Sequence, residues 1–312
     1  MIHFSSQTMQ DILVTLSQKI NLIQTKELVE FVVINPDILS GKYSGEHINI
    51  DSQTYIYRTY KSWLDLSHIL GCRFLTPIVI DENLVKIRYQ KLNPDESFHN
   101  KDTDKEQKYG KESIFNQIHK NEESSFLHYY KQALDNVNIQ KRKHILNLGV
   151  NSGDEFEVII NSTYKIDDLN FVGIDYTESA IDEAKEKFKN YPNFTFFKHD
   201  INELDTLKLE KSDLIITIGT LQSSNLEFNK LLMSIVQNQL KKDGAMILGF
   251  PNCRWIDGEM VYGARVKNYP FSELGLLYKD VMFAKKYLQQ KKYRVTITGK
   301  DYIFLTATSI RS

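Results

Sequence analysis

The pattern of apolar and polar positions differs between the first 94 residues of this chain and its second half. The second half shows short apolar runs separated by amphipathic segments. Such a succession is typical of an α/β fold, in which buried strands alternate with helices. The runs at 144–150 and 171–174 flank a segment that we assign to a helix. Further strands are predicted at 194–199, 214–219 and 245–250, helices at 178–190, 226–240 and 280–292, and a closing strand pair at 294–298 and 302–308.

The first 94 residues follow a different pattern, which predicts a small α+β domain. Between 6 and 20, apolar residues recur every three or four positions, as in an amphipathic helix. An apolar run at 28–34 predicts a strand, and the alternation at 48–60 predicts a β-hairpin. A short helix at 63–70 and a strand or hairpin at 78–89 complete the domain, which we place at 1–94.

A polar stretch separates the two patterns. Residues 95–111 are charged and poor in apolar side chains, which predicts a linker or a mobile loop. The next segment, 114–137, carries its apolar residues mostly on one helical face. We therefore assign 112–312 to a second domain that begins with this leading helix.

Composition sets limits on the class of protein. The chain has 312 residues and a formal net charge of −1, so no global charge attracts it to nucleic acid or to an anionic membrane. No apolar run approaches membrane-spanning length. Cys72 and Cys253 have neither disulfide nor metal-ligand spacing, and the scattered histidines form no metal constellation. We predict a cytoplasmic protein that uses no metal and has no membrane segment.

Residues 144–175 have the pattern of a nucleotide-binding unit: a strand, a glycine-containing turn, a helix and a second strand that ends in Asp175. An acid at that point can accept hydrogen bonds from both ribose hydroxyls. The turn lacks the G-x-G-x-x-G of dinucleotide-binding folds, and Asp154 and Glu155 follow it directly. Two carboxylates would repel a pyrophosphate but tolerate a sulfonium or an ammonium group, which argues against NAD.

From about 139 to 310 the chain resembles the class I S-adenosylmethionine (SAM)-dependent methyltransferases. The loop 147–153 resembles the glycine-rich first motif of that family, and Asp175 resembles its second-strand acid. His199-Asp200-Ile201 is similar to the third motif, and 213–222 is similar to the fourth. The resemblance implies a Rossmann-like sheet of seven strands, SAM as the methyl donor and S-adenosylhomocysteine as the product.

Two positions depart from the first motif. Asn147 stands where an acid is usual, so binding of the methionine end of SAM is expected to be weaker or differently arranged. Asn151 replaces the middle glycine, and we expect it to adopt the left-handed backbone conformation that asparagine tolerates.

The resemblance also implies roles for individual residues. Asp175 would bind the ribose, with Tyr176 beside the adenine edge, and Asp200 with the Ile201 backbone would bracket the adenine. The glycines of the loop would approach the methionine portion, and the end of the fourth strand would lie beneath the sulfonium. The complete set of expected donor-binding residues is Asn147, Gly149, Asn151, Gly153, Asp175, Tyr176, Asp200, Ile201, Gly219, Thr220 and Leu221.

The acceptor side is predicted from a single insertion. Residues 251–275 follow the fifth strand and are rich in aromatic and charged side chains, and loops at this end of parallel strands bind ligands in such folds. The alternative is a surface loop whose aromatic side chains bury one another. The candidate acceptor-binding residues are Arg254, Trp255, Glu259, Tyr262 and Tyr269, and the candidate catalytic residues are Gln222, Trp255 and Tyr262.

These observations favour a SAM-dependent methyltransferase that acts on a small molecule. The N-terminal domain would recognise the acceptor or form homodimer contacts. One alternative is an RNA methyltransferase, acting especially on tRNA, with the N-terminal domain as its RNA-binding module. Another is a SAM-binding regulatory protein without catalytic activity, which the two asparagines of the first motif motivate.

Overall fold

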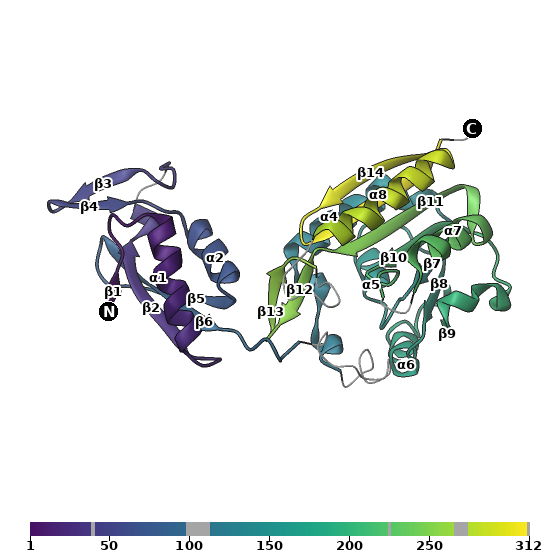
Figure 1. Ribbon diagram of the computed structural model, residues 1–312. Helices are drawn as coiled ribbons and strands as arrows, with labels where there is room; N and C mark the ends of the chain where they lie inside the picture. The colour runs from purple at the N-terminus through teal and green to yellow at the C-terminus, as the bar shows by residue number, and fades with distance from the viewer. Residues whose placement is uncertain (39–40, 98–112, 224–225, 265–273, 311–312) are drawn as a thin grey trace. The chain divides into compact units, whose positions relative to one another are not determined.

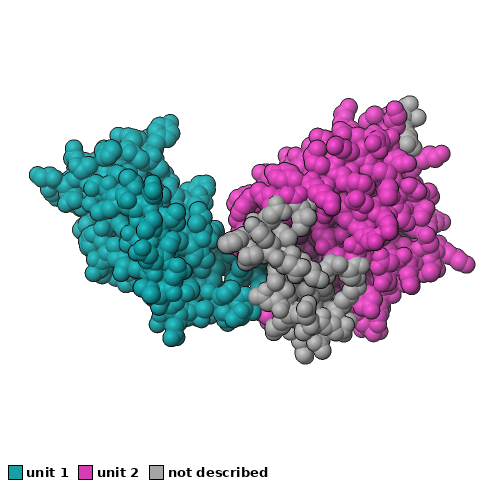
Figure 2. All heavy atoms as spheres, viewed as in Figure 1, with its two compact units in different colours: residues 1–97, 255–261 teal, residues 98–254, 262–312 magenta. Residues whose placement is uncertain are grey.

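The computed structural model describes residues 1–38, 41–97, 113–223, 226–264 and 274–310. Contacts divide the chain into two compact units, coloured separately in Figure 2. Unit 1 comprises Met1–Ser97 together with Trp255–Val261, and unit 2 comprises Phe98–Arg254 and Tyr262–Ser312. No helix in the described part of the chain is long and apolar enough to cross a membrane.

Unit 1 is a small α+β fold, as the sequence predicts. Its four-stranded sheet has the order β1-β2-β6-β5, in which only the β1–β2 pair is parallel (Figure 1). The elements are β1 (Ile2–His3), α1 (Met9–Leu22), β2 (Leu28–Ile34), η1 (Pro36–Ile38), the hairpin β3 (His47–Ile50) and β4 (Gln53–Ile56), α2 (Tyr60–Ile69), β5 (Cys72–Val79) and β6 (Leu84–Lys91).

The core of unit 1 lies between the sheet and its helices. Ile12 and Leu16, four residues apart on α1, are completely buried, as their helical spacing predicts. They belong to the same cluster as Phe31 of β2 and Trp63 of α2. The Tyr89 hydroxyl is buried there and donates a 2.6 Å hydrogen bond to the Trp63 carbonyl, so its polar group is satisfied inside the core.

Seven residues from far along the sequence also belong to unit 1. They form the tip of a hairpin made by β12 (Cys253–Ile256) and β13 (Glu259–Tyr262). Arg73 donates from Nε to Glu259 Oε2 at 3.1 Å, and Lys26 forms an ion pair with the buried carboxylate of Asp257. The sequence pattern assigned the whole insertion to the second domain, because a local pattern does not reveal ion pairs between residues 186 and 231 positions apart.

Unit 2 contains the predicted seven-stranded sheet, with the order β14-β15-β11-β10-β7-β8-β9. All neighbours are parallel except at β15, which runs antiparallel to both β11 and β14. The strands are β7 (His144–Leu148), β8 (Asn170–Asp175), β9 (Phe194–Lys198), β10 (Ser212–Ile218), β11 (Leu240–Pro251), β14 (Tyr293–Gly299) and β15 (Tyr302–Ser309).

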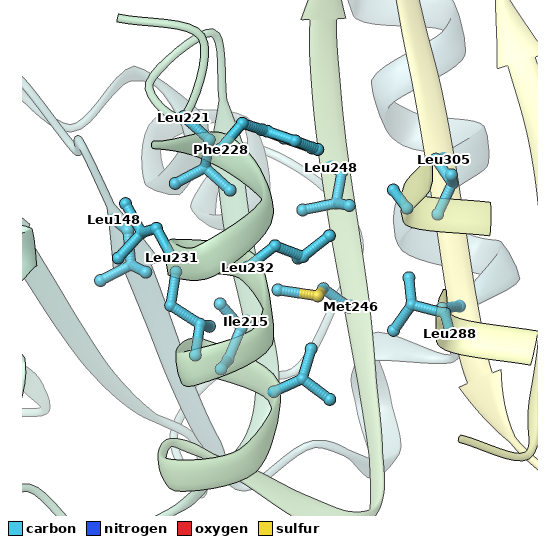
Figure 3. Packing of buried hydrophobic residues seen from close by; sticks show 14 of the residues in the cluster. Leu148, Ile215, Leu221, Phe228, Leu231, Leu232, Met246, Leu248, Leu288 and Leu305 are labelled. Atoms are coloured by element: carbon cyan, nitrogen blue, oxygen red, sulfur yellow. The ribbon is translucent and has the colours of Figure 1, made fainter. Parts of the chain in front are cut away.

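Helices cover both faces of this sheet because side chains along each strand alternate between two cores. Ile145 of β7 belongs to one core and Leu146 to the other. Figure 3 shows the core beneath α7, where Leu232 lies next to Met246 and Leu231 lies toward Leu148. The helices are α4 (Ser124–Asn136), α5 (Asp154–Ile160), α6 (Glu178–Lys187), α7 (Phe228–Asn238) and α8 (Leu274–Gln290), with short 3₁₀ turns η3 (Phe115–Gln117), η4 (Lys120–Glu122), η5 (Ile139–Lys141) and η6 (Ile201–Leu207).

The leading helix is shorter than its apolar pattern suggests. Only Ser124–Asn136 is α-helical, and the residues before it form the 3₁₀ turns η3 and η4. Two side chains hold η4 against the start of α5: Lys120 Nζ donates to Glu155 Oε1 at 2.7 Å, and Asn121 Nδ2 donates to the Asp154 carbonyl at 3.0 Å. These contacts bring η4 to the end of the sheet where the predicted donor loop lies.

Candidate functional site

The loop between β7 and α5 is the centre of the candidate site. Gly149, Asn151 and Gly153 have φ angles of +76°, +46° and +93°. Asn151 thus adopts the left-handed conformation expected for it. The backbone N–H groups of Gly149 and Val150 both donate to the Ile174 carbonyl, at 2.8 and 3.1 Å. The loop is therefore fixed to the end of β8, next to Asp175.

Asp175 is oriented by the backbone on both sides. Its Oδ2 accepts the Asn151 N–H at 2.9 Å, and its Oδ1 accepts the Thr177 N–H at 2.9 Å. The side chain of Thr177 and the backbone N–H of Tyr176 also hydrogen-bond to this carboxylate. Burial raises the pKa of the Asp175 carboxyl above its ordinary value, although the N–H groups of Thr177 and Asn151 oppose that shift. This geometry suits a pair of ribose hydroxyls.

Behind the loop, a buried polar network replaces the usual acid of the first motif. Asn147 is completely buried at the end of β7, and its Nδ2 donates to Glu155 Oε2 at 3.2 Å. The side chain of Glu155 is 1 % exposed, and Lys120 Nζ donates to its other oxygen. Burial alone would lower the pKa of Lys120, but Glu155 and Asp154 raise it above its ordinary value. The carboxyl group of Glu155 therefore lies beside Asn147 and is paired with the ammonium group of Lys120.

The sequence places two carboxylates, Asp154 and Glu155, at the start of α5. In the described structure each of them lies close to a lysine. Glu155 is paired with Lys120, while Asp154 lies 3.6 Å from Lys187 Nζ and 3.9 Å from Lys120 Nζ. A residue 35 positions earlier than Glu155 thus changes the charge of the site, which a motif confined to 147–153 does not reveal.

Two observations fit SAM to this pocket. Asn147 Oδ1 is buried and accepts no hydrogen bond from the described residues, so it can accept one from the ammonium group of SAM. The backbone at Gly149 leaves no room for a side chain, since a Cβ there would lie 1.9 Å from Thr220 Oγ1. Glycine at this position therefore lets the loop pack directly against Thr220, at the end of β10.

The third motif is used partly for local structure. Asp200 precedes η6, and its Oδ1 accepts hydrogen bonds from the backbone N–H and the side-chain amide of Asn202, each at 2.9 Å. Ile201 is buried, and Tyr176 is 47 % exposed beside the ribose acid. His199 Nε2 lies 2.9 Å from the Glu203 carbonyl, which accords with a structural role for that ring.

The end of β10 lies against the same loop. Gly219 has a φ of +75°, and its N–H donates to the Gly249 carbonyl at 2.9 Å. Thr220 contacts Gly149 as described above. The Leu221 side chain is buried in the core, so only its backbone faces a ligand. Gln222 Oε1 is buried and accepts no hydrogen bond within the described structure, which leaves an acceptor available near the loop.

Four of the five candidate acceptor residues lie on the β12–β13 hairpin, and several of their side chains have structural partners. Arg254 Nη1 donates to the carbonyls of Tyr262 and Gly263, each at 3.1 Å, and therefore stabilises its own hairpin. Trp255 and Glu259 belong to unit 1, where Glu259 pairs with Arg73. The Tyr262 side chain is 54 % exposed. Tyr269 lies outside the described residues.

Comparison with known proteins identifies the family. The model of the family described as "Methyltransferase domain" matches residues 139–296, about half of the chain, so this chain belongs to that family. No protein of curated function matches the sequence. With its seven-stranded sheet, the chain is a SAM-dependent methyltransferase, as the sequence predicts.

Several solved methyltransferase structures are similar to this chain at low sequence identity. The CurJ carbon methyltransferase is 12 % identical with a TM-score of 0.50, over 81 % of this chain and 80 % of that one. The N-methyltransferase NodS from Bradyrhizobium japonicum, solved with S-adenosylhomocysteine, is 16 % identical with a TM-score of 0.41, over 60 % and 89 %. A precorrin-6y C5,15-methyltransferase from Geobacter metallireducens is 14 % identical with a TM-score of 0.41, over 58 % and 88 %.

The raised pKa of Asp175 predicts a pH dependence of donor binding. For an Asp175 that binds the ribose hydroxyls as the resemblance implies, the ionised carboxylate is the acceptor, so affinity falls as the pH drops through the pKa of Asp175. Because burial raises that pKa, the loss begins at a higher pH than it would for an ordinary aspartate. Titration calorimetry with S-adenosylhomocysteine between about pH 4 and pH 7 measures the effect. A flat profile over that range would show that Asp175 does not bind the donor in its charged form.

Proposed function

We propose that this methyltransferase acts on a small-molecule acceptor. The observation that carries the proposal is the charge of unit 1, the candidate RNA-binding module. It contains nine lysines and arginines against thirteen aspartates and glutamates. RNA-binding surfaces need an excess of cations to replace the counterions of the phosphates. Unit 1 has the opposite balance, so it is unsuited to RNA.

The basic side chains of unit 1 also have acidic partners close by. Lys86 and Arg88 share Glu30, at 3.6 and 3.3 Å, and Arg73 lies 3.1 Å from Glu259. Such pairs remove part of the attraction that each cation would exert on a phosphate. We therefore assign unit 1 to recognition of the acceptor or to contacts between subunits.

We assign the donor site to the carboxyl ends of β7, β8, β9 and β10. In this proposal Asp175 binds the ribose, and the loop from Gly149 to Gly153 accommodates the methionine portion. Asp200 and Ile201 flank the adenine, although the hydrogen bonds of Asp200 to Asn202 leave it fewer free acceptor positions. SAM supplies an activated methyl group, so the protein has to orient the acceptor and exclude water.

The structure of the first motif does not favour the alternative of a SAM-binding protein without catalytic activity, although Asn147 and Asn151 motivate it. Asn151 takes the backbone conformation that the loop needs. Asn147 is hydrogen-bonded to Glu155, which supplies the carboxylate that Asn147 lacks. The chemical groups of a working donor site are thus retained in a different arrangement.

Transfer of a labelled methyl group tests the acceptor class. The enzyme is incubated with methyl-labelled SAM and either a deproteinised small-molecule extract or total RNA. We expect label in a low-molecular-mass product, and none with the Asp175→Ala variant as a control for background methylation. Label that remains on polymer and is released by nuclease would contradict the proposal and establish RNA as the acceptor.

A further inference from the structure

Lys120 pairs with Glu155 at the start of α5, beside the proposed donor loop, and it lies outside the segment that matches the methyltransferase family. That match begins at residue 139, whereas Lys120 belongs to η4. Its side chain is only 14 % exposed, and its ammonium group lies 5.8 Å from the centre of the Phe126 ring. A lysine held in this way has lost most of its freedom and its hydration, which requires compensation by the site around it.

The compensation comes from carboxylates around the donor loop. Glu155 Oε1 is 2.7 Å from Lys120 Nζ and Asp154 Oδ2 is 3.9 Å away, and the charge of Asp175 also raises the pKa of Lys120. Without Lys120, these acids would make the pocket strongly negative. A negative pocket attracts the ammonium and sulfonium of SAM but repels its carboxylate. The site therefore needs one cation where the carboxylate of SAM binds.

Among the described residues, the ammonium of Lys120 has donors left for that task. It has three N–H groups, and one is used by Glu155. The distance to Asp154 exceeds a hydrogen bond. Beside it, Asn147 Oδ1 is buried and accepts no hydrogen bond from the described residues. Lys120 Nζ, a cationic donor, and Asn147 Oδ1, an acceptor, thus both lie beside Glu155. The first suits the carboxylate of an amino acid and the second suits its ammonium group.

We propose that Lys120 binds the carboxylate of the methionine portion of SAM, with Asn147 Oδ1 accepting from the adjacent ammonium. This inference rests on the donor site proposed above. It makes η4 and α4 a functional part of the methyltransferase unit. Lys120 contributes by binding the donor and takes no part in the transfer of the methyl group.

Three ligands that differ at the methionine end test the assignment by titration calorimetry. They are SAM, decarboxylated SAM and 5′-methylthioadenosine, which lacks the whole amino acid. The wild-type enzyme should bind SAM about tenfold to a hundredfold more tightly than decarboxylated SAM, because one hydrogen bond between charged groups changes an affinity by about that factor. Lys120→Met should abolish this preference and leave the affinity for 5′-methylthioadenosine unchanged.

Lys187→Met is the matched control. Lys187 also lies near an acid of α5, at 3.6 Å from Asp154, but its side chain is 31 % exposed and it does not contact Glu155. We expect this variant to keep the preference for SAM. Equal loss of preference in both lysine variants would overturn the assignment, because a general change in charge would then explain it.

A second variant separates ligand binding from simple neutralisation of Glu155. Lys120→Met alone leaves a buried carboxylate without its partner and can unfold the protein, whereas Lys120→Met with Glu155→Gln removes both charges. We expect the double variant to fold, to bind 5′-methylthioadenosine and to lack the preference for SAM. If the double variant regains the wild-type preference, Lys120 serves only to balance Glu155 and the proposal is wrong. Failure of all three ligands to bind the wild type would reject the donor site itself.

Discussion

Replacing Asp175 by alanine is expected to weaken the binding of SAM by at least about 100-fold. Two hydrogen bonds from the ribose hydroxyls to a carboxylate are lost, and each contributes about 1.5–3 kcal/mol. The variant also frees the N–H groups of Asn151 and Thr177, which Asp175 now accepts at 2.9 Å. The donor loop thereby loses the contact at Asn151, although Gly149 and Val150 still bind the Ile174 carbonyl, so binding of the methionine portion is affected as well.

Calorimetric titration with SAM and S-adenosylhomocysteine measures this loss, and thermal unfolding of the free proteins shows whether the variant is folded. Asp182→Ala is the matched control, because Asp182 is an acid of the adjacent helix α6 whose side chain is 68 % exposed. It should bind both ligands like the wild type. Near-normal binding by a folded Asp175→Ala protein would mean that the nucleoside lies elsewhere in unit 2.

The sequence predicted the sheet well because its signals are local. The parallel strands of the sheet in unit 2 contain short apolar runs, and successive residues such as Ile215 and Ile216 are buried in different cores. A short, continuous apolar run in which successive side chains point to opposite faces indicates a strand buried between two layers of helices. The left-handed conformation of Asn151 was also predictable, since a glycine position in a tight turn leaves few alternatives for another residue.

The parts that the sequence did not reveal depend on long-range pairing. Lys120 looks like an ordinary lysine of a polar segment, and only the fold brings it 2.7 Å from Glu155. The hairpin tip at 255–261 reads as part of the second domain, yet Asp257 and Glu259 find their partners in Lys26 and Arg73. No local pattern of hydrophobic residues specifies which cation a given acid will meet.

The first motif shows how a departure from a family pattern can be compensated nearby. Asn147 lacks the usual charge, but Glu155 lies eight residues later, on the turn of α5 that faces it. Because Glu155 is buried, it requires a cation, and Lys120 provides one. The three side chains therefore form one unit, and a change in any of them should alter the other two.

The second large effect is expected from Gly149→Ala. The backbone at Gly149 has a φ of +76°, where a Cβ costs about 1–2 kcal/mol. That Cβ would also lie 1.9 Å from Thr220 Oγ1 and 2.7 Å from Thr220 Cβ, so β10 and the donor loop would have to separate. Such overpacking costs about 1–3 kcal/mol more. We expect the free energy of unfolding to fall by about 2–5 kcal/mol and SAM binding to be lost.

Gly71→Ala separates the two contributions, because Gly71 has a similar φ of +67° but no atom within 4 Å of the Cβ position. In chemical denaturation it should lose about 1–2 kcal/mol only, and it should bind SAM normally. Adding Thr220→Gly to Gly149→Ala removes the overlapping side chain, so stability should return to the level of Gly71→Ala. If Gly149→Ala is instead as stable as Gly71→Ala and binds SAM, the close contact between the loop and Thr220 does not shape the donor site.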